Sequence, residues 1–166
     1  MSVGDARQGP ASERPGSIST VHRYDLPLPR GEVWALISEV SEYRTWWPWL
    51  RVFEAAALAE SEHWRCEVQP PVPYPVRFRV EIEHVAAPVL VHASVRGDVV
   101  GDATLTLEEG DTGCRATLRS SLAPGNRTLQ LVSRFAGPIA RFGHDWVLDS
   151  GARQFIARAV EPLVGD

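Results

Sequence analysis

A histidine and a carboxylate stand next to each other at His144 and Asp145, and such a pair offers the chemistry of proton transfer. An imidazole beside a carboxylate can take up and return a proton near neutral pH, which would suit an enolisable ligand. Consecutive residues on a helix diverge by about 100°, however, so the two side chains would point in different directions. His144 is therefore a weak catalytic candidate, and structural hydrogen bonding or solvent exposure is its expected role.

The two cysteines, Cys66 and Cys114, do not have the spacing of a metal site. Neither belongs to a Cys-x-x-Cys pair or to a cluster of cysteine and histidine. In a reducing compartment we expect two free thiols that pack as small apolar side chains. The GxSxG, HExxH, Walker A and dinucleotide-binding glycine motifs are also absent from the sequence. We therefore expect no metal and no cofactor.

Arg96 and Asp98 flank Gly97 at the expected end of a strand. A buried pair could hold the carboxylate or phenolate of a ligand, whereas an exposed pair would stabilise a turn. The exposed pair is the favoured interpretation.

Tryptophan is the most unusual feature of the composition. Six are present, and Trp46, Trp47 and Trp49 fall within four positions. At the open end of a curved sheet, large flat side chains with an N–H group suit an aromatic or polycyclic ligand. They could instead fill that end of the sheet and form part of its core. Adjacent residues cannot all point one way, so we expect a divided role. Tyr74 is either a surface turn residue or a donor that orients a ligand carbonyl.

The candidate ligand-binding residues are mostly large and apolar, and each could line a cavity or simply fill the core. For any single one of them, core packing is the favoured interpretation. The predicted set is Trp46, Trp49, Trp64, Tyr74, Phe78, Val80, Phe135, Ile139, Phe142 and Trp146.

The elements that must position these residues begin after a polar tail. Residues 1–16 contain almost nothing apolar and are predicted to be disordered, followed by one domain over 17–166. A strand from Ile18 precedes two short helices, of which the first begins near Pro29 and the second, EYRTWW, is stopped by Pro48.

Alternation then predicts an antiparallel meander of six strands. The segments are WLRVFEAAA, HWRCEVQ, VRFRVEIEHV, PVLVHASVRG, DATLTLEE and CRATLRSSL. From Asn126 to about Val160 the helical period returns, with a kink or break expected at Gly137-Pro138. The stripe expected to face the sheet consists of Leu131, Val132, Phe135, Ile139, Phe142 and Trp146.

This order of elements resembles that of the helix-grip fold. The likeness rests on LPRGEVWALISEVSEYRTWWPWLRVFE, VRGDVVGDATLTLEEGDTGCRATL and RFGHDWVLDSGARQF. Over about residues 17–162 the chain resembles the START-like superfamily, specifically its bacterial polyketide cyclase/dehydrase-like branch, also called SRPBCC proteins. The resemblance implies an α+β fold, in which a curved antiparallel sheet of about seven strands surrounds a long C-terminal helix and encloses an apolar cavity.

Members of that superfamily include lipid carriers, hormone receptors and aromatase/cyclases, so the fold does not fix the function. The first hypothesis is binding of a small hydrophobic ligand such as a lipid or polyketide, for transport or sequestration. The second is a polyketide cyclase, aromatase or dehydratase. The third is an interaction module that exposes the tryptophans at 46–49 to a partner. Whether the chain is an enzyme stays open.

Charge and hydropathy narrow the range of partners. The formal net charge is -4, with 17 basic and 21 acidic residues and no polybasic stripe along the chain, so nucleic acid is not an expected partner. No apolar run approaches the length of about 18 to 20 residues that spans a membrane, and the first residues lack the apolar core of a signal peptide. We expect a cytoplasmic monomer or homodimer without a transmembrane segment.

Overall fold

The computed structural model describes residues 16–71, 74–135 and 137–165, and the side chains of all of these except residues 132–144. The N-terminal half begins with a strand and two short helices separated by a single 3-10 turn at Val40–Glu42. Its elements are β1 (Ile18–Leu26), α1 (Arg30–Ser38), α2 (Tyr43–Trp46), β2 (Leu50–Glu54), β3 (His63–Val68) and β4 (Val76–Ala86). The tail predicted to be disordered, residues 1–16, lies outside the described residues except for Gly16.

The second half completes the sheet and ends in helices. Its strands are β5 (Leu90–Gly97), β6 (Val99–Glu109) and β7 (Cys114–Pro124). They are followed by α3 (Arg127–Phe135), α4 (Gly137–Phe155), a π-helical turn at Ile156–Val160 and α5 (Glu161–Val164).

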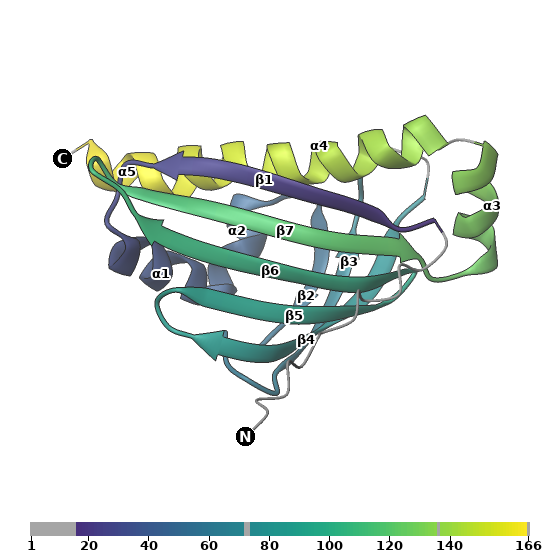
Figure 1. The fold of residues 1–166 in the computed structure, drawn as a ribbon, viewed down its shortest axis with the longest axis horizontal. Coiled ribbons are helices and arrows are strands. Elements are labelled where there is room, and N and C mark those ends of the chain that lie inside the picture. Colours follow the sequence, from purple (N-terminus) through teal and green to yellow (C-terminus); the bar gives the residue numbers. More distant parts are fainter. Residues whose placement is uncertain (1–15, 72–73, 136, 166) are drawn as a thin grey trace, which may run out of the picture.

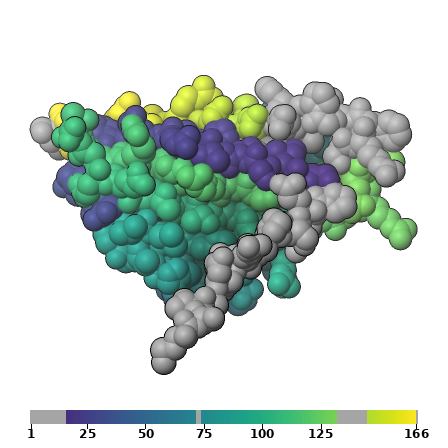
Figure 2. Space-filling model, viewed as in Figure 1, coloured from purple at the N-terminus to yellow at the C-terminus, as the bar shows by residue number. Residues whose placement is uncertain are grey.

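All seven strands form one antiparallel sheet in the order β1-β7-β6-β5-β4-β3-β2. The sheet curves around α4, which runs along the edge strand β1 (Figure 1). Seen from outside, β1, β7 and β6 form a continuous surface beside that helix (Figure 2). The predicted α+β architecture, with two short helices after the first strand and a meander of six further strands, is confirmed.

Alternation along β4 separates an inner face from an outer one. Val76, Phe78 and Val80 are half-buried, whereas Arg77 and Arg79 between them are exposed. Successive side chains of a strand point to opposite faces, so the three apolar residues share the concave face of the sheet.

A close approach of β6 to β7 requires glycine at one position. Gly101 has a φ of 151°, and a Cβ atom there would lie 1.9 Å from the backbone oxygen of Ser121. Any larger residue would therefore push the two strands apart.

The core occupies the end of the molecule where α1, α2 and the last turns of α4 meet the sheet (Figure 1). Val33, Leu107 and Val160 are at most 1% exposed there. The carbonyl of Pro29 accepts a hydrogen bond of 3.1 Å from the amide of Val33, which starts α1. Packing is thus concentrated at one end, and the other end remains open for a cavity.

The C-terminal helical region is broken where the sequence indicated. Figure 1 shows α3 at a steep angle to α4, with the break immediately before Gly137. The prediction that one apolar stripe continues across this break is wrong at Leu131, which is 57% exposed. A change of helix direction resets which face meets the sheet, so the phase of α3 cannot be read from that of α4.

Candidate functional site

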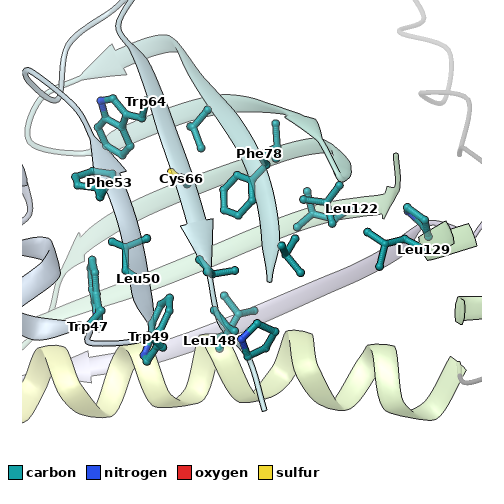
Figure 3. Close-up of a pocket in the computed structure, with 18 of the residues that line it drawn as sticks. Trp47, Trp49, Leu50, Phe53, Trp64, Cys66, Phe78, Leu122, Leu129 and Leu148 are labelled. Carbon is teal, nitrogen blue, oxygen red and sulfur yellow. The ribbon is translucent and has the colours of Figure 1, made fainter. Parts of the chain in front are cut away.

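A cavity of about 410 Å³ lies between the concave face of the sheet and α4 (Figure 3). Its walls come from β1 to β7, from α2 and the residues after it, and from α3 and α4, and they are almost entirely apolar. This volume lies within the range of about 300 to 1,000 Å³ that small-molecule sites occupy.

One end of the cavity is built from aromatic rings. The ring of Tyr43 stacks on that of Phe53 at 5.1 Å and meets the edge of Trp47 at 4.8 Å. Phe53 in turn meets Trp64 at 5.5 Å in a T-shaped arrangement. Rings in mutual contact of this kind leave stiff, flat faces toward the cavity.

The other end of the cavity is aliphatic. Leu122 of β7 and Leu129 of α3 lie there, away from the tryptophans (Figure 3). Val99, at the start of β6, also contributes to the lining. The cavity therefore offers an aromatic end and a more deformable aliphatic end.

The polar atoms of the aromatic end are bound by the protein itself. The indole nitrogen of Trp47 donates to the carbonyl of Gly151 at 2.9 Å, and that of Trp49 donates to Oε1 of Gln154 at 2.7 Å. Trp64 donates to the carbonyl of Ala57 at 3.0 Å. Because these N–H groups are occupied, a ligand meets ring faces rather than free donors.

The phenol of Tyr43 is bound in the same way, since its hydroxyl donates to the carbonyl of Ile37. Burial raises the pKa of this phenol above its usual range. Burial also raises the pKa of the Cys66 thiol to about 12, so the thiol on the cavity wall stays protonated at neutral pH. The hydroxyl of Tyr74, also on the wall, has no hydrogen-bond partner among the described residues.

Half of the predicted ligand-binding residues lie at this cavity. They are Trp49, Trp64, Tyr74, Phe78 and Val80. The side chains of Phe135, Ile139 and Phe142 fall outside the described residues. Contact with a ligand stays a prediction for all of them.

Trp46 and Trp146 do not line the cavity. Trp46 is 5% exposed and meets the edge of Phe155 at 5.3 Å, so it belongs to the core. Its carbonyl accepts a hydrogen bond of 2.9 Å from Arg158, which fixes the end of α2 on the C-terminal helical region. Trp146 stands behind Trp49, with ring centroids 6.4 Å apart, and its neighbours Val147 and Leu148 face the cavity instead.

The alternative of an exposed tryptophan patch at 46–49 finds no support in the burial of these residues. Trp46 is buried, and Trp47 and Trp49 are both half-buried. Hydrogen bonds to the backbone and side chain of α4 turn these two indoles inward. The expected division of roles holds, because one ring enters the core and two face the cavity.

Several wall residues were missed by the sequence-based prediction. Cys66 and Val68 share the parity of Trp64 along β3, so alternation could have identified them. Tyr43 and Phe53 carried no signal of this kind, because their place depends on how α2 packs against β2.

The side chain of His144, the weak catalytic candidate, lies outside the described residues. Asp145 has a different imidazole neighbour, since its Oδ1 lies 3.9 Å from Nε2 of His22 on β1. Oδ1 of Asp149 lies 3.8 Å from Nδ1 of the same ring. These contacts lie between β1 and α4 and do not belong to the cavity lining.

In the part of the chain that the structure describes, no three His, Cys, Asp or Glu side chains gather as metal ligands would. Likewise, none of the described helices combines the length and apolar character needed to cross a membrane. Both cysteines are buried free thiols, as expected.

Comparison with known proteins gives matches in structure but not in sequence. No protein-family model matches the chain, and no curated protein matches it. Protein TTHA0849 from Thermus thermophilus has a TM-score of 0.67 at 14% identity, over 86% of this chain and 99% of that one. Norcoclaurine synthase from Thalictrum flavum, solved with dopamine and hydroxybenzaldehyde, has a TM-score of 0.55 at 11% identity, over 86% and 90%.

A third similar structure is the di-domain ARO/CYC protein BexL from the BE-7585A biosynthetic pathway, with a TM-score of 0.67 at 7% identity. The match covers 84% of this chain and 48% of BexL, so the chain spans about half of that protein. These similarities show the helix-grip fold expected from the order of elements.

Proposed function

We propose that this chain binds a small hydrophobic ligand in the cavity, with a ring system at the aromatic end and an aliphatic part at the other. The observation that carries this proposal is the wall itself, in which the donors of Tyr43, Trp47, Trp49 and Trp64 are already bound by the protein. Such a wall selects a ligand by shape and apolar area. Transport or sequestration of a lipid or polyketide is the role that suits this kind of binding.

The hydroxyl of Tyr74 offers the ligand one polar contact. It belongs to the wall and has no partner among the described residues, so it can donate to an oxygen of the ligand. The preferred ligand is therefore apolar with a single acceptor. That norcoclaurine synthase was solved with two small ring compounds supports the choice of an aromatic ligand for a cavity of this fold.

A cyclase, aromatase or dehydratase would need a group that moves a proton. Within the described wall the ionisable side chains are Tyr43, Tyr74 and Cys66, and burial holds the first and the last in their protonated forms. These residues favour binding over acid–base catalysis. His144→Ala separates the alternatives, because unchanged turnover of a polyketide-like substrate would exclude that histidine as the catalyst.

Titration with 1-anilinonaphthalene-8-sulfonate tests the proposed binding, because the probe fluoresces in apolar surroundings. Val80→Phe fills the cavity from β4, whereas Val21→Phe makes the same change at an exposed position of β1. We expect Val80→Phe to weaken binding by about tenfold or more, equivalent to about 1.4 kcal/mol, and Val21→Phe to leave it unchanged. A folded Val80→Phe protein with unchanged affinity would show that the probe binds elsewhere.

A further inference from the structure

Three arginines stand side by side on the outer face of the sheet, opposite the cavity. Arg65 of β3 pairs in register with Arg79 of β4, which pairs with Arg96 of β5. Directly opposed residues have Cβ atoms about 5 Å apart, so the three side chains form a row about 10 Å long. All three are exposed. We call this group the arginine row.

Among the described residues, an acidic side chain forms an ion pair with only one of the three arginines of the row. Arg65 bonds Glu54 at 3.1 Å. Among the described residues, no carboxylate lies within ion-pair distance of Arg79 or Arg96. In the described part of the chain, two guanidinium groups of the row thus have no carboxylate at ion-pair distance.

The expected pair of Arg96 with Asp98 does not form. Oδ2 of Asp98 accepts from the backbone amide of Arg77 at 2.9 Å, and Oδ1 accepts from the side chain of Asn126 at 2.8 Å. Glu67 is likewise occupied, because it bonds the guanidinium of Arg77 at 2.7 Å. Asp98 and Glu67 are therefore committed to other groups, while Glu81, two residues from Arg79 on the same face of β4, lies 3.8 Å from His63.

The row borders a hollow of about 340 Å³ on the outer side of β3 to β5. Like charges placed directly opposite each other destabilise a sheet, so the row lowers the stability of the folded chain. An anion seated in the hollow would remove that repulsion.

We propose that the arginine row docks an acidic segment of a partner protein. Guanidinium groups bind carboxylates through two parallel hydrogen bonds, and several carboxylates in sequence would engage several arginines at once. A single small anion would gain little at these exposed positions, because water screens each contact. Binding to several groups of one segment overcomes that limit.

Other occupants fit less well. Glu54 and Glu67 border the row and would repel a broad anionic surface such as a membrane, whereas a narrow segment can avoid them. The N-terminal residues 1–15 contain two acidic and two basic side chains, so they carry no excess of negative charge to cover it. Docking at the arginine row does not depend on a ligand in the cavity.

The test uses a fluorescently labelled deca-glutamate peptide and two matched double variants. Arg79→Gln with Arg96→Gln removes two charges from the row. Arg23→Gln with Arg119→Gln removes two charges from exposed outer positions of β1 and β7. We expect the first pair to weaken peptide binding by about tenfold and the second by less than about twofold. The first pair should also melt no lower than the wild type, since it removes repulsion.

Three outcomes would overturn the proposal. Equal losses in both double variants would show that the peptide senses net charge alone. Phosphate that displaces the peptide at matching concentrations would identify a small-anion site. The third outcome concerns vesicles of phosphatidylcholine with phosphatidylglycerol. A lipid surface would be the occupant if these vesicles bind the wild type more tightly than the peptide does and bind the Arg79→Gln, Arg96→Gln variant more weakly.

Discussion

The indole nitrogen of Trp49 donates a hydrogen bond of 2.7 Å to Oε1 of Gln154. Trp49 lies just before β2 and lines the cavity, whereas Gln154 lies near the end of α4. The indole of Trp47 makes a corresponding bond of 2.9 Å to the carbonyl of Gly151. These two bonds join the helix to the sheet and hold both rings in fixed planes beside the cavity (Figure 3).

Gln154→Leu removes the acceptor and keeps an apolar side chain of similar size. We expect the free energy of unfolding to fall by about 1 to 3 kcal/mol, because the half-buried indole N–H loses its partner. Urea denaturation followed by circular dichroism measures this change. Gln154→Glu retains an oxygen acceptor and should stay within about 0.5 kcal/mol of the wild type. Equal losses in both variants would assign the effect to packing.

The Cys66 thiol makes stability depend on alkaline pH. Its pKa in the folded chain is raised by burial to about 12, whereas an unfolded cysteine titrates near about 8.5. Between these values the unfolded chain releases a proton that the folded chain keeps. The contribution of this thiol is therefore complete below about pH 8.5 and declines as the pH rises, by about 1.4 kcal/mol per pH unit.

Urea melts between about pH 8 and pH 10 measure this slope, and Cys66→Ala is the matched variant. Cys114 and Tyr43 also have pKa values raised by burial and remain in both proteins, so their contributions cancel in the comparison. We expect the wild type to lose stability more steeply than Cys66→Ala above about pH 8.5. Parallel curves would contradict a protonated, buried thiol.

Alternation along β4 was enough to predict that Phe78 and Val80 share the dry face of the sheet, because parity along one strand decides which face a side chain takes, but it left open whether they line a cavity or fill the core. The arginine row could not be predicted in this way. It depends on the register of three strands, and Arg65, Arg79 and Arg96 are far apart in the sequence. Charge counted along the chain therefore missed a cluster that exists only in the folded sheet.

The helical side of the cavity could not be predicted fully from the sequence either, for a different reason. The helical period from Asn126 to about Val160 predicted one stripe, but the break before Gly137 gives α3 and α4 separate phases. Leu129 therefore faces the cavity, while Leu131 is exposed. Side-chain hydrogen bonds, such as that between Trp49 and Gln154, also join residues whose relation only the packed structure defines.

The aliphatic end of the cavity should respond to the length of a ligand's chain. Each buried methylene contributes about 0.8 kcal/mol, so one added carbon should tighten binding by about fourfold until the cavity is full. A series of phenyl alkyl ketones of increasing chain length, measured by displacement of the fluorescent probe, provides the test. Leu122→Ala should weaken the longer members more than the shorter ones, because Leu122 lies at the aliphatic end. An equal loss of affinity for all members of the series would show that the alkyl chain of the ligand does not lie at the aliphatic end.

Asn126 connects the start of α3 to the sheet. Its Oδ1 accepts a hydrogen bond of 2.8 Å from the amide of Leu129, and its Nδ2 donates to Oδ1 of Asp98 at 2.8 Å. Leu129 lines the aliphatic end of the cavity, so this cap holds part of the wall in place. Asn126→Ala removes both bonds and should destabilise α3 by about 0.5 to 2 kcal/mol. Faster amide hydrogen exchange in α3 would record that loss.

A loosened α3 should also release the ligand faster, because the segment that carries Leu129 then opens more often. Stopped-flow dissociation of the fluorescent probe measures the rate, and we expect it to rise in Asn126→Ala. Asn126→Ser keeps an acceptor for the amide of Leu129 but gives up the donor to Asp98, so it separates the cap from the bridge to the sheet. If exchange in α3 accelerates while dissociation stays unchanged, the ligand leaves by a path that does not involve this helix.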